Sequence, residues 1–411
     1  MEYKNKIMTE LFETSDRLIR SVPVAFTRYL FSKINWGVRL VEIAGSRGVG
    51  KTTLLLQRAK ELNGQAAGQA LFVSLDDPWF YSHSLIDTAA EYVRNGGRVL
   101  LLDEVHKYPN KHPDFDWSSE LKTIYDHYPS LQVVYTSSSL LRLYKGQGDL
   151  SRRKTLYNLK GLSFREYLAF YEIGRFPPVT IDELLSRHSE VSSMIVDKIR
   201  IIPHFKKYLN TGYYPFYPEA PDQYVDRLKS VINVIVENDL PAVADISYDS
   251  LIKIKKLLAV IASSVPYTPN LSRIRQELFI SDQRTLLNYL NYLDQAELIT
   301  VLSREARGNQ LLRKPDKIYL NNSNLLGCFS NLPDTGTIRE TFFLNQVSNP
   351  LQVNYPVQGD FLVNGTWTFE VGGRTKTREQ IKDVQNAFLA LDDVETGTGQ
   401  TIPLWLFGFL Y

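Results

Sequence analysis

Gly45-Ser46-Arg47-Gly48-Val49-Gly50-Lys51-Thr52 stands between an apolar run, Leu40 to Ala44, and a stretch of helix-forming residues that continues to Glu61. Its spacing matches the pattern G-x-x-x-x-G-K-[ST], in which a strand turns through a loop into a helix. Glycines let the backbone curl so that successive N–H groups face one point, and the helix start adds partial positive charge there. The stretch therefore predicts a phosphate-binding loop inside an α/β sheet.

A loop of this kind predicts a nucleoside triphosphate held together with a divalent cation, and we expect ATP and Mg²⁺. Lys51 is expected to bridge the β- and γ-phosphates and to act in catalysis, while Thr52 places its hydroxyl on Mg²⁺. The expected nucleotide-binding residues are Gly45, Ser46, Arg47, Gly48, Val49, Gly50, Lys51, Thr52 and Thr53.

Two acids follow a second apolar run, Val99 to Leu102. Asp103 is expected to hold Mg²⁺, because ligands gather at the carboxyl ends of such strands. Neighbouring residues at a strand end point in opposite directions, so Glu104 is expected to face the attacking water as general base. Asp76 and Asp77 form a rival pair, but the run before them is less apolar.

A third strand, Leu131 to Tyr135, ends in hydroxyl side chains. Thr136, or alternatively Ser137, is the expected polar sensor of the γ-phosphate. Capping of a following helix is the alternative reading of both residues. Arg152 or Arg153 could reach a γ-phosphate as an arginine finger, although most such arginines are surface residues, and the sequence leaves this open.

Alternating short strands and helices between residues 38 and 140 predict a parallel P-loop sheet, so the fold class is α/β. Further domains are expected because 411 residues exceed one ordinary core. The expected domains are the P-loop domain with an N-terminal helix (1–160), a helical lid or linker (161–245), a winged helix (246–325) and a small α/β domain (338–411).

Composition is that of a globular protein, with 44% apolar and 22% charged residues and a net charge of +2. No apolar run is long enough for a membrane helix, and the charged start, Met1 to Arg20, does not read as a signal peptide. Cys328 is the single cysteine, which agrees with a reducing compartment. We therefore expect a cytoplasmic protein without a membrane partner.

The order of elements between residues 246 and 325 is that of a winged helix-turn-helix. The expected helices are 249–263, 271–278 and 282–296, and the expected strands are 298–302 and 317–320. Residues 251–317 carry eleven Lys and Arg against six Asp and Glu. Double-stranded DNA is therefore a candidate partner of 246–325, with protein binding as the alternative. The candidate contacts are Arg284, Asn288 and Asn291 on the third helix and Arg304, Arg307, Arg313 and Lys314 in the wing.

The order of motifs resembles the bacterial and archaeal AAA-type ATPases that carry a trailing domain of unknown function, over nearly the whole chain. The matching stretches are Ala44 to Thr53, Leu102 to His106, Tyr135 to Ser139 and Leu162 to Tyr167. The resemblance implies ATP hydrolysis, a strand inserted between the two Walker strands, a catalytic glutamate at Glu104 and a sensor at Thr136. The sequence departs from the family at Ser137, where a glycine is common.

The tail, 338–411, resembles restriction-endonuclease-like folds in its order of elements and in its acids Glu340, Asp360 and Glu370. Its expected elements are a helix from 338, strands 351–355, 361–363 and 366–371, a helix 378–391 and a final strand. Such nucleases need a lysine two residues beyond the second acid, and Gly372 stands there. Lys376 would reach the site only if the chain folded back, so we expect a nuclease-like fold without activity.

Three functions follow in order of preference. The first is a Mg²⁺-dependent ATPase that moves its winged-helix part, with DNA as the candidate partner. The second is a slow ATP-dependent switch or scaffold that holds a protein partner through the C-terminal domain, and the third is an active nuclease regulated by ATP. The sequence leaves the oligomeric state open, and also whether the C-terminal domain binds metal.

Overall fold

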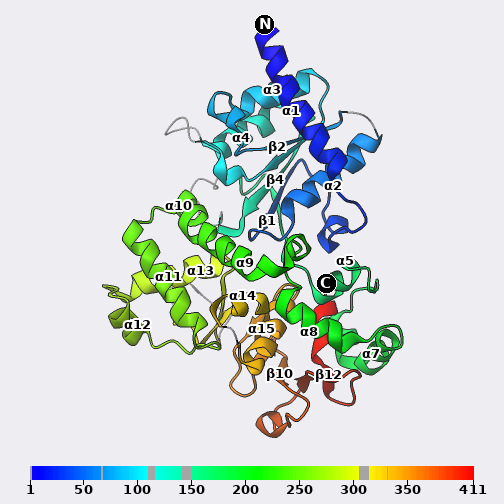
Figure 1. Ribbon diagram of the computed structural model, residues 1–411, viewed down its shortest axis with the longest axis vertical. Helices are drawn as coiled ribbons and strands as arrows, with labels where there is room; N and C mark the ends of the chain where they lie inside the picture. The colour runs from blue at the N-terminus through cyan, green and yellow to red at the C-terminus, as the bar shows by residue number, and fades with distance from the viewer. Residues whose placement is uncertain (1, 66–67, 110–115, 141–149, 305–313, 331) are drawn as a thin grey trace. The chain divides into compact units, whose positions relative to one another are not determined.

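The computed structural model describes residues 2–65, 68–109, 116–140, 150–304, 314–330 and 332–411, and of residues 2–8 the backbone only (Figure 1). The chain divides into two compact units. Unit 1 comprises Met1–Leu159 and Asn238–Asp245, and unit 2 comprises Lys160–Glu237 and Ile246–Tyr411. The short segment Asn238–Asp245 thus belongs to unit 1, although the chain on both sides of it belongs to unit 2.

Unit 1 is built on a five-stranded parallel sheet with the order β2-β3-β4-β1-β5. The strands are β1 (Leu40–Gly45), β2 (Ala70–Ser74), β3 (Val99–Asp103), β4 (Gln132–Ser138) and β5 (Thr155–Asn158). β4 lies between β1 and β3, so the inserted strand that the family resemblance implies is confirmed. β5 was not predicted, because its four residues show no apolar run, and none of them is fully buried.

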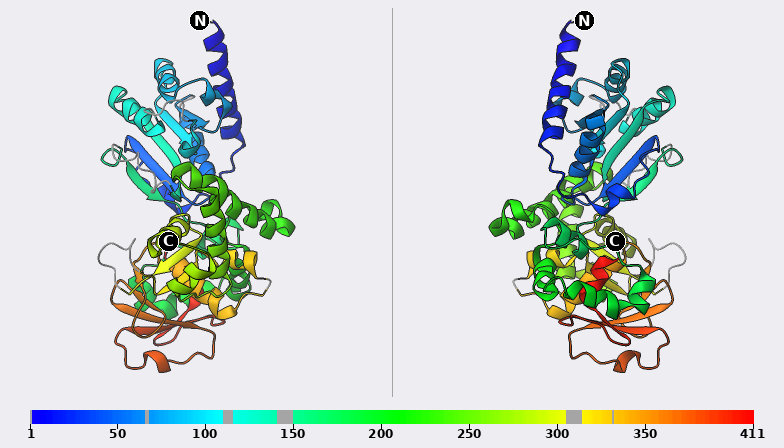
Figure 2. Two further views of the ribbon diagram at one scale, coloured as in Figure 1. Left: turned by 90° about the vertical axis from the view of Figure 1, so that its left-hand side faces the viewer. Right: turned by 90° about the vertical axis from the view of Figure 1, so that its right-hand side faces the viewer.

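The inner strands β1 and β3 are rich in apolar residues, and every residue in them is buried, including the acids Glu42 and Asp103. A strand buried on both faces reads as a continuous apolar run, as expected for a parallel sheet covered by helices. The helices of unit 1 include α1 (Glu2–Ser21), α2 (Lys51–Gln65), α3 (Leu85–Arg94) and α4 (Trp117–His127). α1 runs beside α2 (Figure 2) and contacts β2, where Ser15 Oγ accepts a hydrogen bond from the Phe72 N–H at 3.0 Å.

Unit 2 begins with helices of the expected lid. These are α5 (Phe164–Phe170), α6 (Ile181–Ser186), α7 (His188–Val196), α8 (Ile201–Thr211) and α9 (Tyr224–Val234). Their aromatic side chains lie in one core with residues of the tail: Phe164 packs edge-on against Phe409, and Phe205 against Phe342. Two segments that the sequence places on either side of residues 246–325 therefore share one core.

Between them, the part of 246–325 that the structure describes has the expected order of elements. They are α11 (Tyr248–Ala262), α12 (Leu271–Glu277), α13 (Gln283–Gln295) and the antiparallel pair β6 (Ile299–Leu302) and β7 (Lys317–Leu320). Asp282 caps α13, because its carboxylate accepts a hydrogen bond from the Thr285 N–H at 2.9 Å. Of the wing residues named above, Arg307 and Arg313 lie outside the described residues.

The tail holds a mixed five-stranded sheet with the order β12-β11-β10-β9-β8, preceded by α14 (Ser323–Phe329) and α15 (Thr335–Val347). Its strands are β8 (Val353–Asn354), β9 (Phe361–Val363), β10 (Trp367–Gly372), β11 (Ala387–Leu391) and β12 (Thr401–Pro403).

Two predictions for the tail are wrong. The expected helix 378–391 is a short 3-10 turn, Glu379–Ile381, followed by β11, which pairs in parallel with β10. A short apolar run can be a buried strand or a buried helix, and its pairing with β10 is visible only in three dimensions. The apolar end of the chain is strand only to Pro403 and then a buried 3-10 helix, Leu404–Phe409.

Candidate functional site

The glycine-rich loop connects β1 to α2 as its pattern predicts. Gly48 and Gly50 have φ values of 85° and 96°, a region that residues with a Cβ rarely adopt. Gly45 is needed for a different reason, since a Cβ there would lie 2.3 Å from the carbonyl oxygen of Leu159. The backbone therefore has the tight curl that a phosphate cradle requires.

Lys51 and Thr52 begin α2 at the mouth of this loop. The Lys51 ammonium donates hydrogen bonds to the carbonyl oxygens of Gly45, at 2.8 Å, and Ser46, at 2.9 Å. The Thr52 hydroxyl donates to Oδ2 of Asp103 at 2.6 Å. The structure thus brings together the two residues that the sequence assigns to Mg²⁺, from α2 and from the end of β3.

Asp103 is buried and has a second hydroxyl partner, Thr136, whose Oγ1 donates to Oδ1 of Asp103. The same Thr136 oxygen accepts a hydrogen bond from the Glu104 N–H at 2.9 Å. Burial raises the pKa of Asp103, as does the nearby Glu104 charge, while the hydrogen bonds from Thr136 and Thr52 act in the opposite direction. Thr136 therefore orients both acids of the pair, and it does so from the inserted strand β4.

Glu104 and Asp103 have different partners, but for a reason other than the predicted strand alternation. β3 ends at Asp103, and Glu104 adopts a left-handed conformation with φ 53° and ψ 49°. This conformation costs about 1 kcal/mol or more for a residue with a side chain, and such strain clusters at functional sites. The Glu104 carboxylate pairs with Lys107 and lies 3.8 Å from Nη1 of Arg47.

The alternatives raised by the sequence have other partners in unit 1. Asp76 pairs with Lys107 at 3.3 Å, next to Glu104. Asp77 caps a 3-10 turn, since its carboxylate accepts a hydrogen bond from the Trp79 N–H at 2.9 Å. Ser137 points to the other face of β4, where its hydroxyl donates to the buried Glu42 at 2.7 Å. Arg153 pairs with Asp126 at 3.2 Å. The arginine-finger role of Arg152 or Arg153 stays a prediction.

One residue at the loop was not found from the sequence. Asp239 accepts two hydrogen bonds from Arg47, Nε to Oδ2 at 3.1 Å and Nη2 to Oδ1 at 2.8 Å. His106, which has no assigned role, is buried with Nε2 at 4.0 Å from Asp239 Oδ1. Asp239 lies 192 positions from Arg47 in the chain, so no local pattern could have placed it there.

The acids of the tail are drawn together around β10. Glu340 on α15 accepts a hydrogen bond from the Tyr319 hydroxyl at 2.7 Å, and Asp360 accepts one from the Val371 N–H at 2.9 Å. Glu370 is fully buried, and its carboxylate forms an ion pair with Lys376 at 2.5 Å. The tail thus holds three acids and one lysine as a connected cluster.

Lys376 reaches this cluster, because the chain folds back, which is the condition expected from the sequence for such a contact. β10 ends at Gly372, and the chain turns back so that Lys376 lies over it. A Cβ on Gly372 would lie 2.7 Å from Cβ and Cγ of Lys376. The absence of a side chain at Gly372 leaves the space that Lys376 occupies. Sequence spacing gives no sign of this contact. Among the described residues, no three His, Cys, Asp or Glu side chains are arranged to hold a metal ion.

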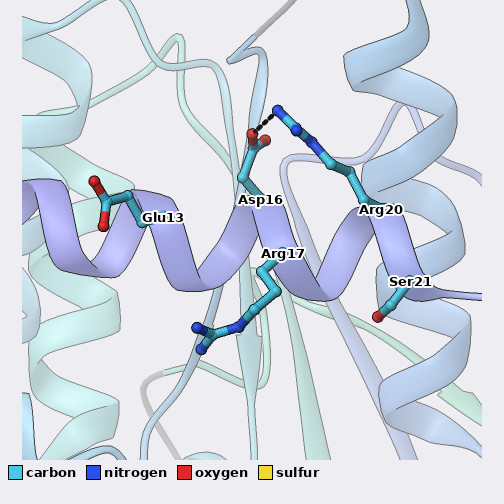
Figure 3. Close-up of a pocket in the computed structure, with 5 residues that line it drawn as sticks. All are labelled: Glu13, Asp16, Arg17, Arg20 and Ser21. Carbon is cyan, nitrogen blue, oxygen red and sulfur yellow. Dashed lines mark hydrogen bonds and ion pairs between the residues drawn. The ribbon is translucent and has the colours of Figure 1, made fainter.

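A separate hollow of about 600 Å³ lies along α1 (Figure 3). Its lining consists of side chains of this one helix: Glu13, Asp16, Arg17, Arg20 and Ser21. Arg20 pairs with Asp16 at 2.6 Å as an exposed helix-surface pair, which contributes little to stability. The hollow includes no residue of the loop or of the acidic pair.

In the described parts of the chain, no helix combines the length and apolar character required to cross a membrane.

Comparison with family models supports the reading of unit 1. Residues 38–168 match the model of an AAA domain, and residues 202–336 match that of a domain of unknown function (DUF8612). No curated protein matches the sequence. The match to the AAA domain model covers the residues of the parallel sheet, and the predicted α/β class is confirmed for this part. Neither model identifies a winged helix or a restriction-endonuclease-like domain.

Solved structures give weaker likenesses. DnaA from Aquifex aeolicus bound to AMPPCP is 16% identical, with 64% of this chain and 84% of that chain covered and a TM-score of 0.27. ORC1 from Aeropyrum pernix in complex with DNA is 12% identical, with coverages of 80% and 92% and a TM-score of 0.31. RuvB from Thermotoga maritima is 18% identical, with coverages of 75% and 90% and a TM-score of 0.26. TM-scores this low do not define a common architecture.

Proposed function

We propose that this chain is a Mg²⁺-dependent ATP hydrolase. The observation that carries the proposal is the continuous hydrogen-bonded line Thr52–Asp103–Thr136–Glu104, which starts beside the phosphate loop. Its members come from α2, the end of β3 and β4 and meet at one edge of the sheet. That edge is where open parallel α/β sheets bind their ligands.

The phosphate loop and the residues of this line have distinct tasks in the proposed reaction. The N–H groups of the loop and the Lys51 ammonium bind the β- and γ-phosphates. Glu104 takes the proton of the attacking water, while Thr136 holds the backbone of Glu104 in its left-handed conformation through the 2.9 Å hydrogen bond. Because Asp103 is engaged by two hydroxyls, its carboxylate is oriented before any ligand enters.

The donor set fits Mg²⁺. Thr52 Oγ1 and Asp103 Oδ2, 2.6 Å apart, offer two oxygens, and Mg²⁺ in such sites takes one or two protein oxygens together with water and phosphate. When bound, Mg²⁺ neutralises charge that develops on the phosphate oxygens. The Asp103 carboxylate must be ionised to bind a cation. Because its pKa is raised, acid conditions protonate it more readily and oppose metal binding.

We further propose that ATP turnover moves residues 246–325 and that these residues contact DNA. The observation in favour is the exposed face of α13, where Arg284 and Asn288 are exposed and Asn291 is partly exposed at helical spacing. The opposite face, including Leu286 and Leu290, is buried in the module. A basic and amide-bearing helix face suits phosphates and base edges alike.

ATP turnover measured with and without double-stranded DNA tests this coupling. Stimulation by DNA supports the DNA-moving ATPase. Slow turnover that DNA leaves unchanged favours the alternative, an ATP-dependent switch or scaffold with a protein partner on the C-terminal domain. Absence of turnover in the presence of Mg²⁺ contradicts the hydrolase itself.

A further inference from the structure

Glu104 stands in the middle of a row of five charged side chains of alternating sign. In order along the row they are Asp239, Arg47, Glu104, Lys107 and Asp76. Arg47 Nη1 lies 3.8 Å from Glu104 Oε1, and Lys107 pairs closely with the other carboxylate oxygen. Each cation is also held on its far side by an acid, Arg47 by Asp239 at 2.8 Å and Lys107 by Asp76 at 3.3 Å.

Of the two outer pairs in the row, Asp239–Arg47 is more buried than Asp76–Lys107. Asp239 is only 4% exposed, and it takes Arg47 through two hydrogen bonds in the fork geometry of a guanidinium. Burial lowers the pKa of Arg47, but the hydrogen bond and charge of Asp239 outweigh it and the net shift is upward. Burial lowers the pKa of His106 to about 4, so this neighbour is neutral near pH 7. Among the described residues, Arg47 is thus the cation that balances Asp239.

The Asn238–Asp245 segment fixes Asp239 in this position by apolar packing. Asp239 directly precedes α10 (Leu240–Val243), in which Leu240 and Val243 are buried. α10 contacts the 3-10 turn Val105–Lys107, which begins immediately after Glu104. The segment is therefore docked beside the proposed base independently of the Asp239 charge.

We propose that Asp239 is a positioning residue for ATP hydrolysis, which it serves by holding Arg47 away from a full ion pair with Glu104. The inference rests on the proposed function, since it concerns the base of that reaction. Without Asp239, the half-buried guanidinium of Arg47 would turn to the nearest anion, and that is Glu104. A carboxylate engaged by Lys107 on one side and by a two-bonded Arg47 on the other has few lone pairs left for a water proton.

A double-substitution cycle tests this, with steady-state ATP turnover and equilibrium binding of a fluorescent ATP analogue as readouts. Asp239→Asn is expected to lower kcat about tenfold while KM and affinity stay within about threefold, because only the base is disturbed. In the Arg47→Gln background the same Asp239→Asn change is expected to alter kcat by less than about twofold, because the mispairing cation is gone. Asp239→Glu, which keeps the charge, is expected to retain most of the turnover.

Asp245→Asn is the matched control, since it removes the same charge from the same segment, and it is expected to behave as wild type. The inference fails if Asp239→Asn slows turnover equally in both backgrounds, or if it raises KM and leaves kcat unchanged. Failure of the proposed function is seen separately: the wild type then does not turn over ATP, or Glu104→Gln hydrolyses ATP as fast as wild type. If Asp239→Asn does not fold, turnover by Asp239→Glu is compared in the wild-type and the Arg47→Gln backgrounds. A decrease in kcat of the same size in both backgrounds overturns the inference.

Discussion

Oγ1 of Thr52 lies 2.6 Å from Oδ2 of Asp103, although the two residues are 51 positions apart and belong to α2 and β3. The distance joins the phosphate loop to the second strand of the site. The Glu104 carboxylate pairs with Lys107 instead, so the two acids of the Asp103–Glu104 pair have different partners. This difference in partners supports the separate roles that we propose for the two acids.

Lys51→Ala is expected to abolish ATP binding. The ammonium lies at the loop within 2.9 Å of both the Gly45 and Ser46 carbonyl oxygens, and its removal leaves the β- and γ-phosphates without their positioned cation. Titration with a fluorescent ATP analogue measures this, with the exposed Lys33→Ala as control. Unchanged affinity in a folded Lys51→Ala protein contradicts the assignment of the loop.

Glu104→Gln and Asp103→Asn are expected to differ in kinetics. Glu104→Gln keeps ATP affinity and lowers turnover by about 10²- to 10⁴-fold, the usual contribution of a general base. Asp103→Asn also weakens Mg²⁺-dependent binding, because it removes a charged oxygen beside Thr52. Binding and turnover are measured for both variants over a range of Mg²⁺. Wild-type turnover by Glu104→Gln places the base elsewhere.

His106 is expected to make unit 1 sensitive to acid. Burial lowers its pKa from 6.5 to about 4; Lys51 and Lys107 act in the same direction, and Asp239 and Glu104 oppose it. The unfolded chain gains a proton below pH 6.5 while the folded chain does not, so stability falls as pH drops from about 6.5 to about 4. The full loss is about 3 kcal/mol.

Thermal unfolding at pH 7 and at pH 4.5 checks this. His106→Gln is expected to lose less stability between the two values than wild type, whereas His127→Gln, at an exposed position, is expected to follow wild type. Equal losses in all three proteins would mean that other groups carry the acid sensitivity.

Arg284→Ala is expected to weaken DNA binding about equally for unrelated duplexes. Arg284 is exposed on α13, and a phosphate contact carries no sequence information. Binding is measured for two duplexes over a range of salt; the slope of log K against log salt is expected to fall by about one when Arg284 is removed. Arg187→Ala, at an exposed helix-surface pair, serves as control. If DNA binding is absent or independent of salt, the alternative that residues 246–325 bind a protein is favoured.

The tail is expected not to cleave DNA. Its acids already have protein partners: Lys376 pairs with Glu370, Tyr319 donates to Glu340 and the Val371 N–H donates to Asp360. A metal ion would have to displace the Lys376 ammonium from a buried carboxylate. Incubation with Mg²⁺ or Mn²⁺, ATP and linear or branched DNA tests this, and cleavage that disappears in Asp360→Ala would establish the nuclease.

The sequence by itself predicted the residues of the proposed nucleotide site, because its parts are local. The loop is contiguous, and the apolar strand before it and the helix after it are recognised from short stretches of sequence. Asp103 and Glu104 directly follow a second apolar run. The carboxyl ends of parallel strands meet at one edge of a sheet, so these local signals converge without further information. The same reasoning predicted α11, α12 and α13 to within two residues at each end.

Only the tertiary structure decided which distant residues complete the site. Asp239 reaches Arg47 across 192 positions, and Lys376 reaches Glu370 because Gly372 leaves room for it. The helices from Phe164 to Thr211 and the tail share a core that no single window of sequence contains. β11 likewise became a strand by pairing with β10. In each case the outcome depends on a contact between segments remote in sequence, and local propensity carries no information about such contacts.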